Sequence, residues 1–168
     1  VVQVTAENDV ASSVWLRDNF VIMADAVILA VPQYKLVAIL PPQLKEEFSK
    51  LTTIDVAPIV SIHLWFNQEF MQHESVGLID RRIQWLFNRR QINHEQGNGA
   101  HVSAVISGAY NFVDKTKDEL VKIAVEDMRS VYPNLREEPL HAIVIREKSA
   151  TYSSCPVTEP LRPPANTE

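Results

Sequence analysis

Four short apolar segments in the middle of the chain constrain its fold most strongly. They cover residues 59–67, 76–80, 83–88 and 101–109, and turn-like stretches such as HEQGNG separate them. Segments of this length that are rich in β-branched and aromatic residues are typical of strands. Because their connections are short, neighbouring strands should run antiparallel. The segments therefore predict one sheet, mostly antiparallel.

One long amphipathic helix and a further strand should complete this sheet. In residues 116–131, Thr116 and Glu119 have the spacing of a capping box, and apolar residues recur along one stripe. We expect the acidic residues of this helix to form its solvated face. Residues 140–153 then predict a long strand.

The first 55 residues are organised differently. Residues 1–4 predict a strand and residues 5–13 a polar connection. Residues 14–23 predict a β-hairpin, because the turn formers Asp18 and Asn19 separate two apolar runs. This region therefore adds a second, smaller group of strands.

Apart from Asp25, the stretch ADAVILAVP, residues 24–32, is apolar and rich in β-branched side chains, without polar alternation. This composition is typical of a strand buried on both faces, and the final proline would end its pairing. A buried helix is the alternative for so short a run. Residues 33–51 have helical spacing interrupted by Pro41 and Pro42, which predicts two short helices.

Composition and charge exclude several classes of protein. The formal net charge is −5, whereas a nucleic-acid partner requires a basic surface, and we expect the pair Arg81-Arg82 to be solvated. Cys155 is the only cysteine, which excludes a disulfide framework and fits a reducing, cytoplasmic compartment. No apolar run is long enough to cross a bilayer, and the five histidines lack the spacing of a metal site.

Catalytic and phosphate-binding motifs are scarce. His101, Ser103 and Ser107 share one predicted strand, but no nucleophile elbow surrounds them. The four glycines form no Gly-x-Gly-x-x-Gly turn or P-loop. Catalytic residues therefore stay unassigned. Large rings gather on or beside the predicted strands and could either line a cavity for an apolar ligand or belong to the core: Trp65, Phe66, Trp85, Phe87, Tyr110, Phe112 and Tyr152.

The order of these pieces resembles a known superfamily. A hairpin followed by ADAVILAVP, LPPQL and APIVSIHLWFNQEF is similar to the flavin-dependent amine oxidases and phytoene desaturases. Within that superfamily, IQWLFNRR, HVSAVISGAYNFVDKTKDELV, VYPNLREEPLHAIVIREKSATYS and EPLRP resemble the squalene-associated FAD-dependent desaturases, also called hydroxysqualene dehydroxylases. The resemblance covers nearly the whole chain.

The resemblance implies that the chain is an internal fragment of the α+β class, cut from an α/β FAD-binding fold. Residues 1–55 would be part of the FAD-binding domain, with strand, hairpin, strand and short helices. Residues 56–155 would form the substrate-binding domain, a mixed, mostly antiparallel sheet with the packed long helix. Residues 156–168 would be a linker that returns to the FAD domain. The Gly-x-Gly-x-x-Gly segment that holds the FAD pyrophosphate in this family does not occur in the chain.

The activity implied by the resemblance is FAD-dependent chemistry on a C30 isoprenoid, namely conversion of hydroxysqualene to squalene in hopanoid biosynthesis. The fragment would contribute the apolar wall of the substrate cavity and would be inactive alone. Two alternatives are a carotenoid-type or phytoene-type desaturase and a binding module for an apolar ligand that uses no flavin. The complete reading frame distinguishes the binding module from the enzyme, because a Gly-x-Gly-x-x-Gly segment upstream of residue 1 would support the enzyme.

The resemblance also carries over a few site residues. Val2 (or Val1) would contact FAD through its backbone, and Ala30 and Pro32 would pass near the cofactor. Ser61 stands where amine oxidases of the superfamily have a lysine near the flavin, so amine oxidation is not expected. The expected substrate-lining residues are Ser61, His63, Trp65, Trp85 and Lys148.

Two further contacts are expected. The apolar LVAIL segment, residues 36–40, together with an apolar substrate, suggests peripheral contact with the inner face of a bacterial membrane. A second copy of the chain could cover the apolar faces of residues 24–32 in a homodimer.

Overall fold

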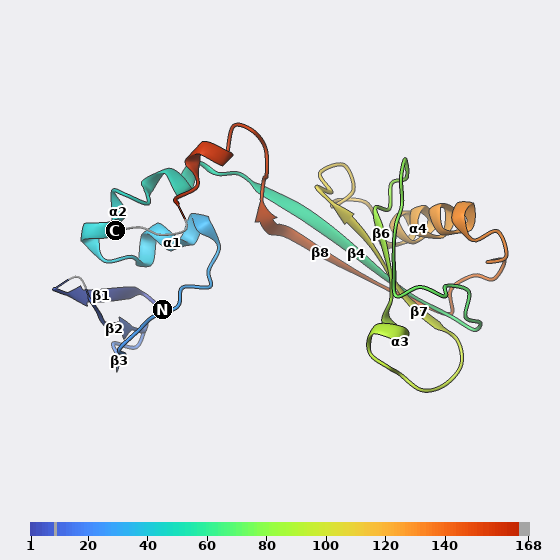
Figure 1. Ribbon diagram of the computed structural model, residues 1–168, viewed down its shortest axis with the longest axis horizontal. Coiled ribbons are helices and arrows are strands. Elements are labelled where there is room, and N and C mark those ends of the chain that lie inside the picture. Colours follow the sequence, from blue (N-terminus) through green and yellow to red (C-terminus); the bar gives the residue numbers. More distant parts are fainter. Residues whose placement is uncertain (9, 165–168) are drawn as a thin grey trace. The chain divides into compact units, whose positions relative to one another are not determined.

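The computed structural model describes residues 1–8 and 10–164 (Figure 1). The chain divides into two compact units. Unit 1 comprises Val1–Val56 and the described residues from Tyr152 onward, and unit 2 comprises Ala57–Thr151. Residues 152–155, which the sequence assigned to the second domain, therefore lie in unit 1 together with the expected linker.

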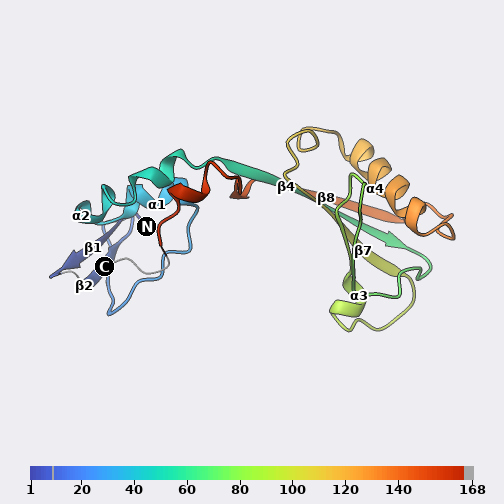
Figure 2. The ribbon, with the colours of Figure 1, turned by 45° about the horizontal axis from the view of Figure 1, so that its top comes forward.

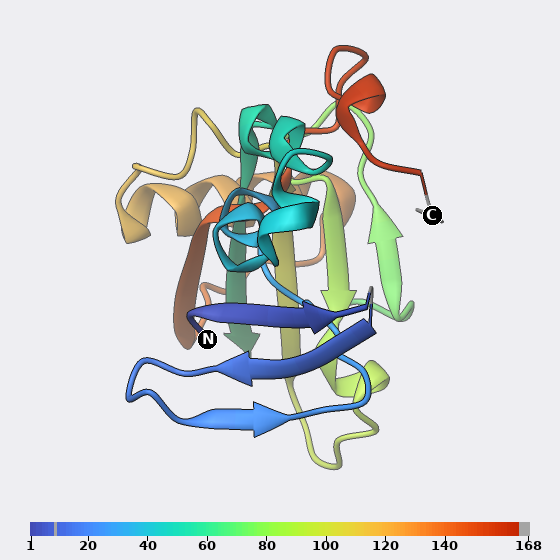
Figure 3. The same ribbon diagram turned by 90° about the vertical axis from the view of Figure 1, so that its left-hand side faces the viewer.

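Unit 1 contains a three-stranded antiparallel sheet in the order β1-β2-β3, whose strands lie side by side in Figure 3. The strands are β1 (Gln3–Glu7), β2 (Val10–Trp15) and β3 (Val21–Met23). The predicted hairpin is confirmed: the Asn19 N–H donates to the Leu16 carbonyl across 3.2 Å in its turn.

The polar connection predicted for residues 5–13 is wrong, because residues 5–7 belong to β1 and residues 10–13 belong to β2. Polar side chains are accommodated in the strands since they hydrogen-bond each other across the pair. The Thr5 hydroxyl lies 2.6 Å from that of Ser13 and 3.2 Å from that of Ser12. Pairing of hydroxyl groups across two strands stabilises a sheet without an apolar pattern.

The strand predicted for ADAVILAVP is also wrong. Residues 24–32 form no strand, and Ile28 is 94% exposed. A strand requires an edge with free backbone groups to pair with. The last pairing bond of this sheet joins the Ala24 N–H to the Ser12 carbonyl, and no strand in the described part of the chain pairs with the residues that follow.

Short helices complete unit 1. The two predicted helices are confirmed, and each begins after a proline, as the fixed φ angle of proline favours. They are followed by a 3-10 turn, and Leu40, Leu51 and Ile54 are buried with Val4 in a small core. The helical segments are α1 (Gln33–Ile39), α2 (Pro42–Lys45), η1 (Ser49–Thr53) and η2 (Glu159–Leu161).

Unit 2 contains the predicted antiparallel sheet. Its five strands have the order β5-β6-β7-β4-β8, and β7 pairs antiparallel with both β4 and β6. A four-residue helix, α3 (Arg89–Ile92), directly follows β6. The strands are β4 (Val56–Phe66), β5 (Ser75–Gly77), β6 (Trp85–Asn88), β7 (Ala100–Ser107) and β8 (His141–Tyr152).

Helix α4 (Lys117–Val131) packs along one face of this sheet (Figure 2). Its capping box is confirmed: the Thr116 hydroxyl accepts from the Glu119 N–H at 3.2 Å, and the Thr116 N–H donates to the Glu119 carboxylate at 2.8 Å. The apolar stripe of the helix meets the sheet in the main core, with Leu120 and Met128 fully buried.

The solvated helix face predicted for the acidic residues of α4 is wrong at one position. Asp127 is only 4% exposed. Its carboxylate accepts from Arg82 at 2.6 and 3.1 Å and from the Ile83 N–H at 2.9 Å. Arg82 is therefore also not a freely solvated charge, and together these groups attach the segment before β6 to the helix.

Candidate functional site

Side chains of the unit 2 sheet alternate between two faces, and α4 packs on one of them. Along β4, Val60, Ile62 and Leu64 are each 0% exposed and lie in the core beside the helix. The residues between them lie on the opposite face, since successive side chains of a strand point to opposite sides. We call this the open face; it carries Ile59, Ser61, His63, Trp65, Trp85, Phe87, His101, Ser103, Val105, His141, Ile143 and Ile145.

The register of β7 brings residues from distant parts of the chain into rows across the open face. Val105 is the pairing partner of both Ser61 and Trp85. Two residues earlier in β7, Ser103 pairs with both His63 and Phe87. Paired residues of neighbouring strands lie on the same face, about 5 Å apart. The open face is therefore a continuous surface across β6, β7 and β4.

Rings cover much of this surface. The Trp65 ring stacks on His101 with centroids 4.2 Å apart and an interplanar angle of 15°, and His141 approaches Trp65 from β8 at 5.2 Å. At the other side of β7, Trp85 and Phe87 stack with centroids 6.0 Å apart. Trp85 nevertheless stays 47% exposed. An exposed aromatic surface of this kind is typical of a binding site rather than of a monomer surface.

Two histidines form the polar centre of the open face. His63 Nδ1 lies 3.2 Å from His101 Nε2, within hydrogen-bonding distance. Burial lowers the pKa of His63, and the charge of Arg89 lowers it further. Burial also lowers the pKa of His101, with the charges of His63 and Arg89 acting in the same direction and Glu95 opposing them. Both rings are therefore neutral at pH 7, and the proton between them belongs to one ring or the other.

The structure brings four of the five expected substrate-lining residues together. Ser61, His63, Trp65 and Trp85 all lie on the open face, the first and the last flanking the same residue of β7. Lys148 lies elsewhere: its ammonium group pairs with the Asp114 carboxylate at 3.1 Å. Arg146 lies two residues before Lys148 on β8 and therefore on the same face of the strand. Its guanidinium group donates a hydrogen bond to the Lys115 carbonyl near the start of α4.

Three ring-bearing residues of the open face are not among the substrate-lining residues that the sequence predicts. The sequence predicts His101 only as a strand residue and Phe87 only as one of the rings that line a cavity or belong to the core, and it assigns no role to His141. Strand alternation alone would have placed Phe87 beside Trp85, because the two are separated by one residue. The contacts of His101 and His141 with Trp65 depend on strand pairing over long sequence distances, which no local pattern contains.

The described residues do not by themselves form a flavin site. Val2, Ala30 and Pro32 are exposed and lie in unit 1, and the Val2 N–H already donates to the Trp15 carbonyl at 2.7 Å. The glycines lie in β5, in the loop before β7 and directly after β7, so none begins a helix that could bind a phosphate. The phosphate groups of a flavin dinucleotide would have to be held by other residues.

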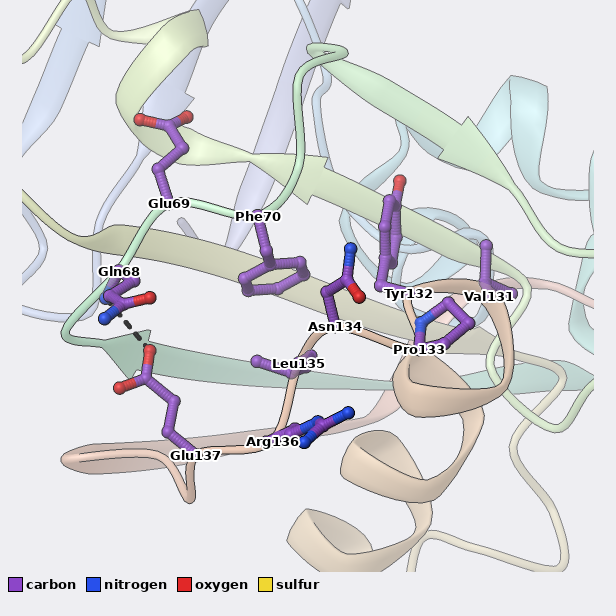
Figure 4. A pocket seen from close by; sticks show the side chains of 10 residues that line it. All are labelled: Gln68, Glu69, Phe70, Val131, Tyr132, Pro133, Asn134, Leu135, Arg136 and Glu137. Carbon is purple, nitrogen blue, oxygen red and sulfur yellow. Dashed lines mark hydrogen bonds between the residues drawn. The ribbon is translucent and has the colours of Figure 1, made fainter.

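A separate cavity of about 690 Å³ lies in unit 2 at the end of α4 (Figure 4). Phe70 and Tyr132 meet edge to face at 5.3 Å beside it, and burial raises the pKa of Tyr132. The carboxylate of Glu137 accepts from the Gln68 N–H at 2.9 Å. None of the expected site residues lines this cavity, and its polar groups form no nucleophile-base pair, so the open face is the better candidate.

Metal clusters and membrane-spanning helices are absent from the part of the chain that the structure describes. Within residues 1–8 and 10–164, no cluster of three or more His, Cys, Asp or Glu side chains is arranged to bind a metal ion. Among the same residues, no helix has the length and apolar character needed to span a bilayer.

Comparison with known proteins supplies the family context. The sequence profile described as flavin containing amine oxidoreductase matches residues 1–167. A 15-cis-phytoene desaturase (chloroplastic/chromoplastic) of an Oncidium hybrid cultivar is 22% identical over 160 residues, which are 88% of this chain and 28% of that protein. The corresponding protein of Solanum lycopersicum is 21% identical over 94% of this chain and 29% of its own length. This chain therefore spans less than a third of these relatives.

Solved structures show a similar fold. An oxidoreductase from Methanosarcina mazei superimposes with a TM-score of 0.65 and 17% identity, over 88% of this chain and 37% of that one. Reduced UDP-galactopyranose mutase superimposes with a TM-score of 0.61 and 8% identity, over 82% of this chain and 32% of that one. This chain therefore shares its fold with about a third of each of these proteins.

Proposed function

Because this chain belongs to the family of flavin containing amine oxidoreductases, we propose that it forms part of an FAD-dependent oxidoreductase and lines the substrate site of that enzyme with its open face. The observation that carries this proposal is the open face itself, an exposed surface of stacked rings and β-branched side chains on the central strands of a rigid sheet. Apolar surfaces with a few placed polar groups are typical of ligand sites.

The proposed substrate is a C30 isoprenoid, and the proposed reaction is conversion of hydroxysqualene to squalene in hopanoid biosynthesis. Support comes from the character of the open face on β4, β6 and β7, which is apolar except for its serines and histidines and has no carboxylate on these three strands to bind an amine. Ser61, where the resemblance expects the lysine of amine oxidases, also lies on this face. A flavin would supply the redox chemistry, and this chain's residues would bind the substrate, orient it and exclude water.

A second candidate is a carotenoid-type desaturase acting on phytoene or a similar hydrocarbon. The similarity to 15-cis-phytoene desaturases over 88% of this chain favours it. Both candidates use the same apolar wall, and they differ in whether the substrate carries a hydroxyl group. A flavin-free module that binds an apolar ligand is the remaining alternative, and a purified protein without flavin would favour it.

The test uses the protein expressed from its complete reading frame, loaded with FAD and given hydroxysqualene under reducing conditions. We expect squalene in the organic extract by mass spectrometry. Trp85→Ala should raise the Michaelis constant about tenfold, as removal of a central aromatic contact does in other binding sites. Trp15→Ala is the matched control, because Trp15 is similarly exposed, at 41%, but belongs to unit 1 and is not part of the open face. A flavin-loaded protein that yields no squalene contradicts the dehydroxylase assignment.

Two contacts of the protein also belong to this proposal. A peripheral contact with the cytoplasmic face of a membrane would give access to an insoluble substrate, although Leu40 of the LVAIL segment is buried within unit 1. Binding to liposomes tests it. Pairing of two copies through exposed apolar residues such as Ile28 is tested by sedimentation.

A further inference from the structure

We propose that the His63–His101 pair binds the single hydroxyl group of an otherwise apolar substrate. The inference rests on the proposed function, because it assigns a role to two residues within the proposed substrate wall. It also favours an isoprenoid alcohol over the hydrocarbon substrate of the second candidate. The two rings would be specificity-determining residues, and a pure hydrocarbon would leave their hydrogen-bonding groups unused.

The hydrogen bond within the pair leaves one nitrogen free on each ring. It joins His63 Nδ1 to His101 Nε2, so His63 Nε2 and His101 Nδ1 are the groups that remain. Neither of them hydrogen-bonds another side chain or backbone group of the described residues. Both rings are only half-buried, so a ligand on the open face can reach them.

The two free nitrogens have complementary character whichever ring holds the shared proton. In a pair of neutral imidazoles, the ring that donates the shared hydrogen bond has an acceptor as its other nitrogen, and the ring that accepts has an N–H donor. The pair therefore offers one donor and one acceptor. A hydroxyl group is also both a donor and an acceptor, so an alcohol matches the pair in either tautomer.

The surroundings of the pair disfavour other polar ligands. His63 lies beside Ser103, and the neighbouring residues of the open face are Trp65, Phe87 and Val105. No acidic side chain pairs with these positions in β4, β6 or β7 to bind an amine, and the charges of Arg89 and Glu95 shift the pKa of His101 in opposite directions. A cavity of about 360 Å³ opens beside Trp65 and His101 and gives room for the polar end of a chain.

The experiment compares a C15 isoprenoid alcohol with its hydrocarbon counterpart. Dissociation constants of farnesol and farnesene are measured by equilibrium dialysis with the FAD-loaded protein from the complete reading frame. His63→Phe and His101→Phe keep a ring on the apolar face but remove the free nitrogens. Each should weaken farnesol binding about threefold to tenfold, the range for one neutral hydrogen bond, and leave farnesene binding unchanged or tighter.

Two controls make the result specific. His73→Phe removes an exposed histidine outside the open face and should change neither constant. Retained farnesene binding shows that a variant is folded. If both variants lose it, a crystal structure of the unsubstituted protein with farnesol decides, since the hydroxyl oxygen should lie within hydrogen-bonding distance of His63 Nε2 or His101 Nδ1.

The possible results separate the two proposals. The role of the pair is overturned if the ratio of the dissociation constants for farnesol and farnesene is the same in both variants as in the unsubstituted protein. It is also overturned if the crystal structure shows the hydroxyl group of farnesol bound away from the two histidines. If in that case Trp85→Ala still weakens both ligands, the open face remains the substrate wall. If Trp85→Ala affects neither ligand, the proposed substrate wall is wrong as well.

Discussion

Replacing Asp127 with alanine should destabilise unit 2 strongly, although the residue lies on a helix whose other acidic groups face water. Its carboxylate is the acceptor for the Ile83 N–H, a bond of 2.9 Å in the buried interior. The same carboxylate accepts from the Arg82 guanidinium at 2.6 Å. Alanine removes both contacts, and Ile83, at 0% exposure, has no access to water in exchange.

The expected loss follows from the unequal surroundings of the two donors. A buried N–H left without an acceptor costs about 1–3 kcal/mol. The Arg82 side chain is 42% exposed and can turn to water, so loss of its ion pair with Asp127 should lower the free energy of unfolding by at most about 1 kcal/mol. We therefore expect the free energy of unfolding to fall by about 2–3 kcal/mol. Asp127→Asn should cost less, because the amide oxygen can still accept from Ile83.

The measurement is urea unfolding followed by tryptophan fluorescence in a Trp15→Phe background, where Trp65 and Trp85 report on unit 2 alone. With a slope of about 1–2 kcal/mol per molar urea for a unit of this size, the midpoint should fall by about 1–3 M. Glu126→Gln is the control, since Glu126 contacts the same Arg82 at 3.0 Å but is 46% exposed. An Asp127→Ala variant no less stable than this control refutes the reasoning.

Two further predictions concern the open face and the loop beside it. Folding lowers the pKa values of His63 and His101, so the unfolded chain binds more protons than the folded protein as the pH falls. The free energy of unfolding should therefore be highest above the ordinary pKa of 6.5 and should decrease as the pH drops below that value. Unfolding is compared at pH 7.5 and pH 5.5, about one unit either side of that value, and the decrease in the free energy of unfolding should be smaller in His63→Phe than in the unsubstituted protein. Equal decreases in the two proteins would contradict this prediction. A Cβ at Gly99 would lie 2.5 Å from the Phe66 carbonyl oxygen at φ +89°, so Gly99→Ala should lower the thermal midpoint more than Gly108→Ala, whose Cβ at φ +59° meets nothing within 4 Å. Equal shifts of the two midpoints would mean that the close approach at Gly99 costs nothing.

Much of unit 2 follows from local patterns in the sequence. Each predicted strand of its sheet is present, and the Thr116 and Glu119 spacing marks the start of α4 correctly. These features are predictable because they depend on residues a few positions apart, through strand alternation and capping. Alternation also explains why Ser61, His63 and Trp65 share one face.

The misjudged features depend on groups that are distant in the sequence. Residues 24–32 have the composition of a buried strand, but composition does not supply a partner edge, and they stay extended and unpaired in the described chain. Asp127 has the spacing of a surface residue and is buried because Arg82 and Ile83 contact it from 45 and 44 positions away, respectively. A helical pattern identifies a face and does not show which segment will cover it.

The candidate site depends on a single strand, β7. Strands β4 and β6 are not neighbours in the sheet, so Ser61 and Trp85 belong to one surface only because both pair with Val105. A shift of β7 by one residue would replace the open-face set of His101, Ser103 and Val105 with Val102, Ala104 and Ile106. That shift would remove His101 from His63 and place the imidazole in the core beside α4, where a polar ring without a partner is costly. The burial of Val102, Ala104 and Ile106 against α4 therefore holds the two histidines together.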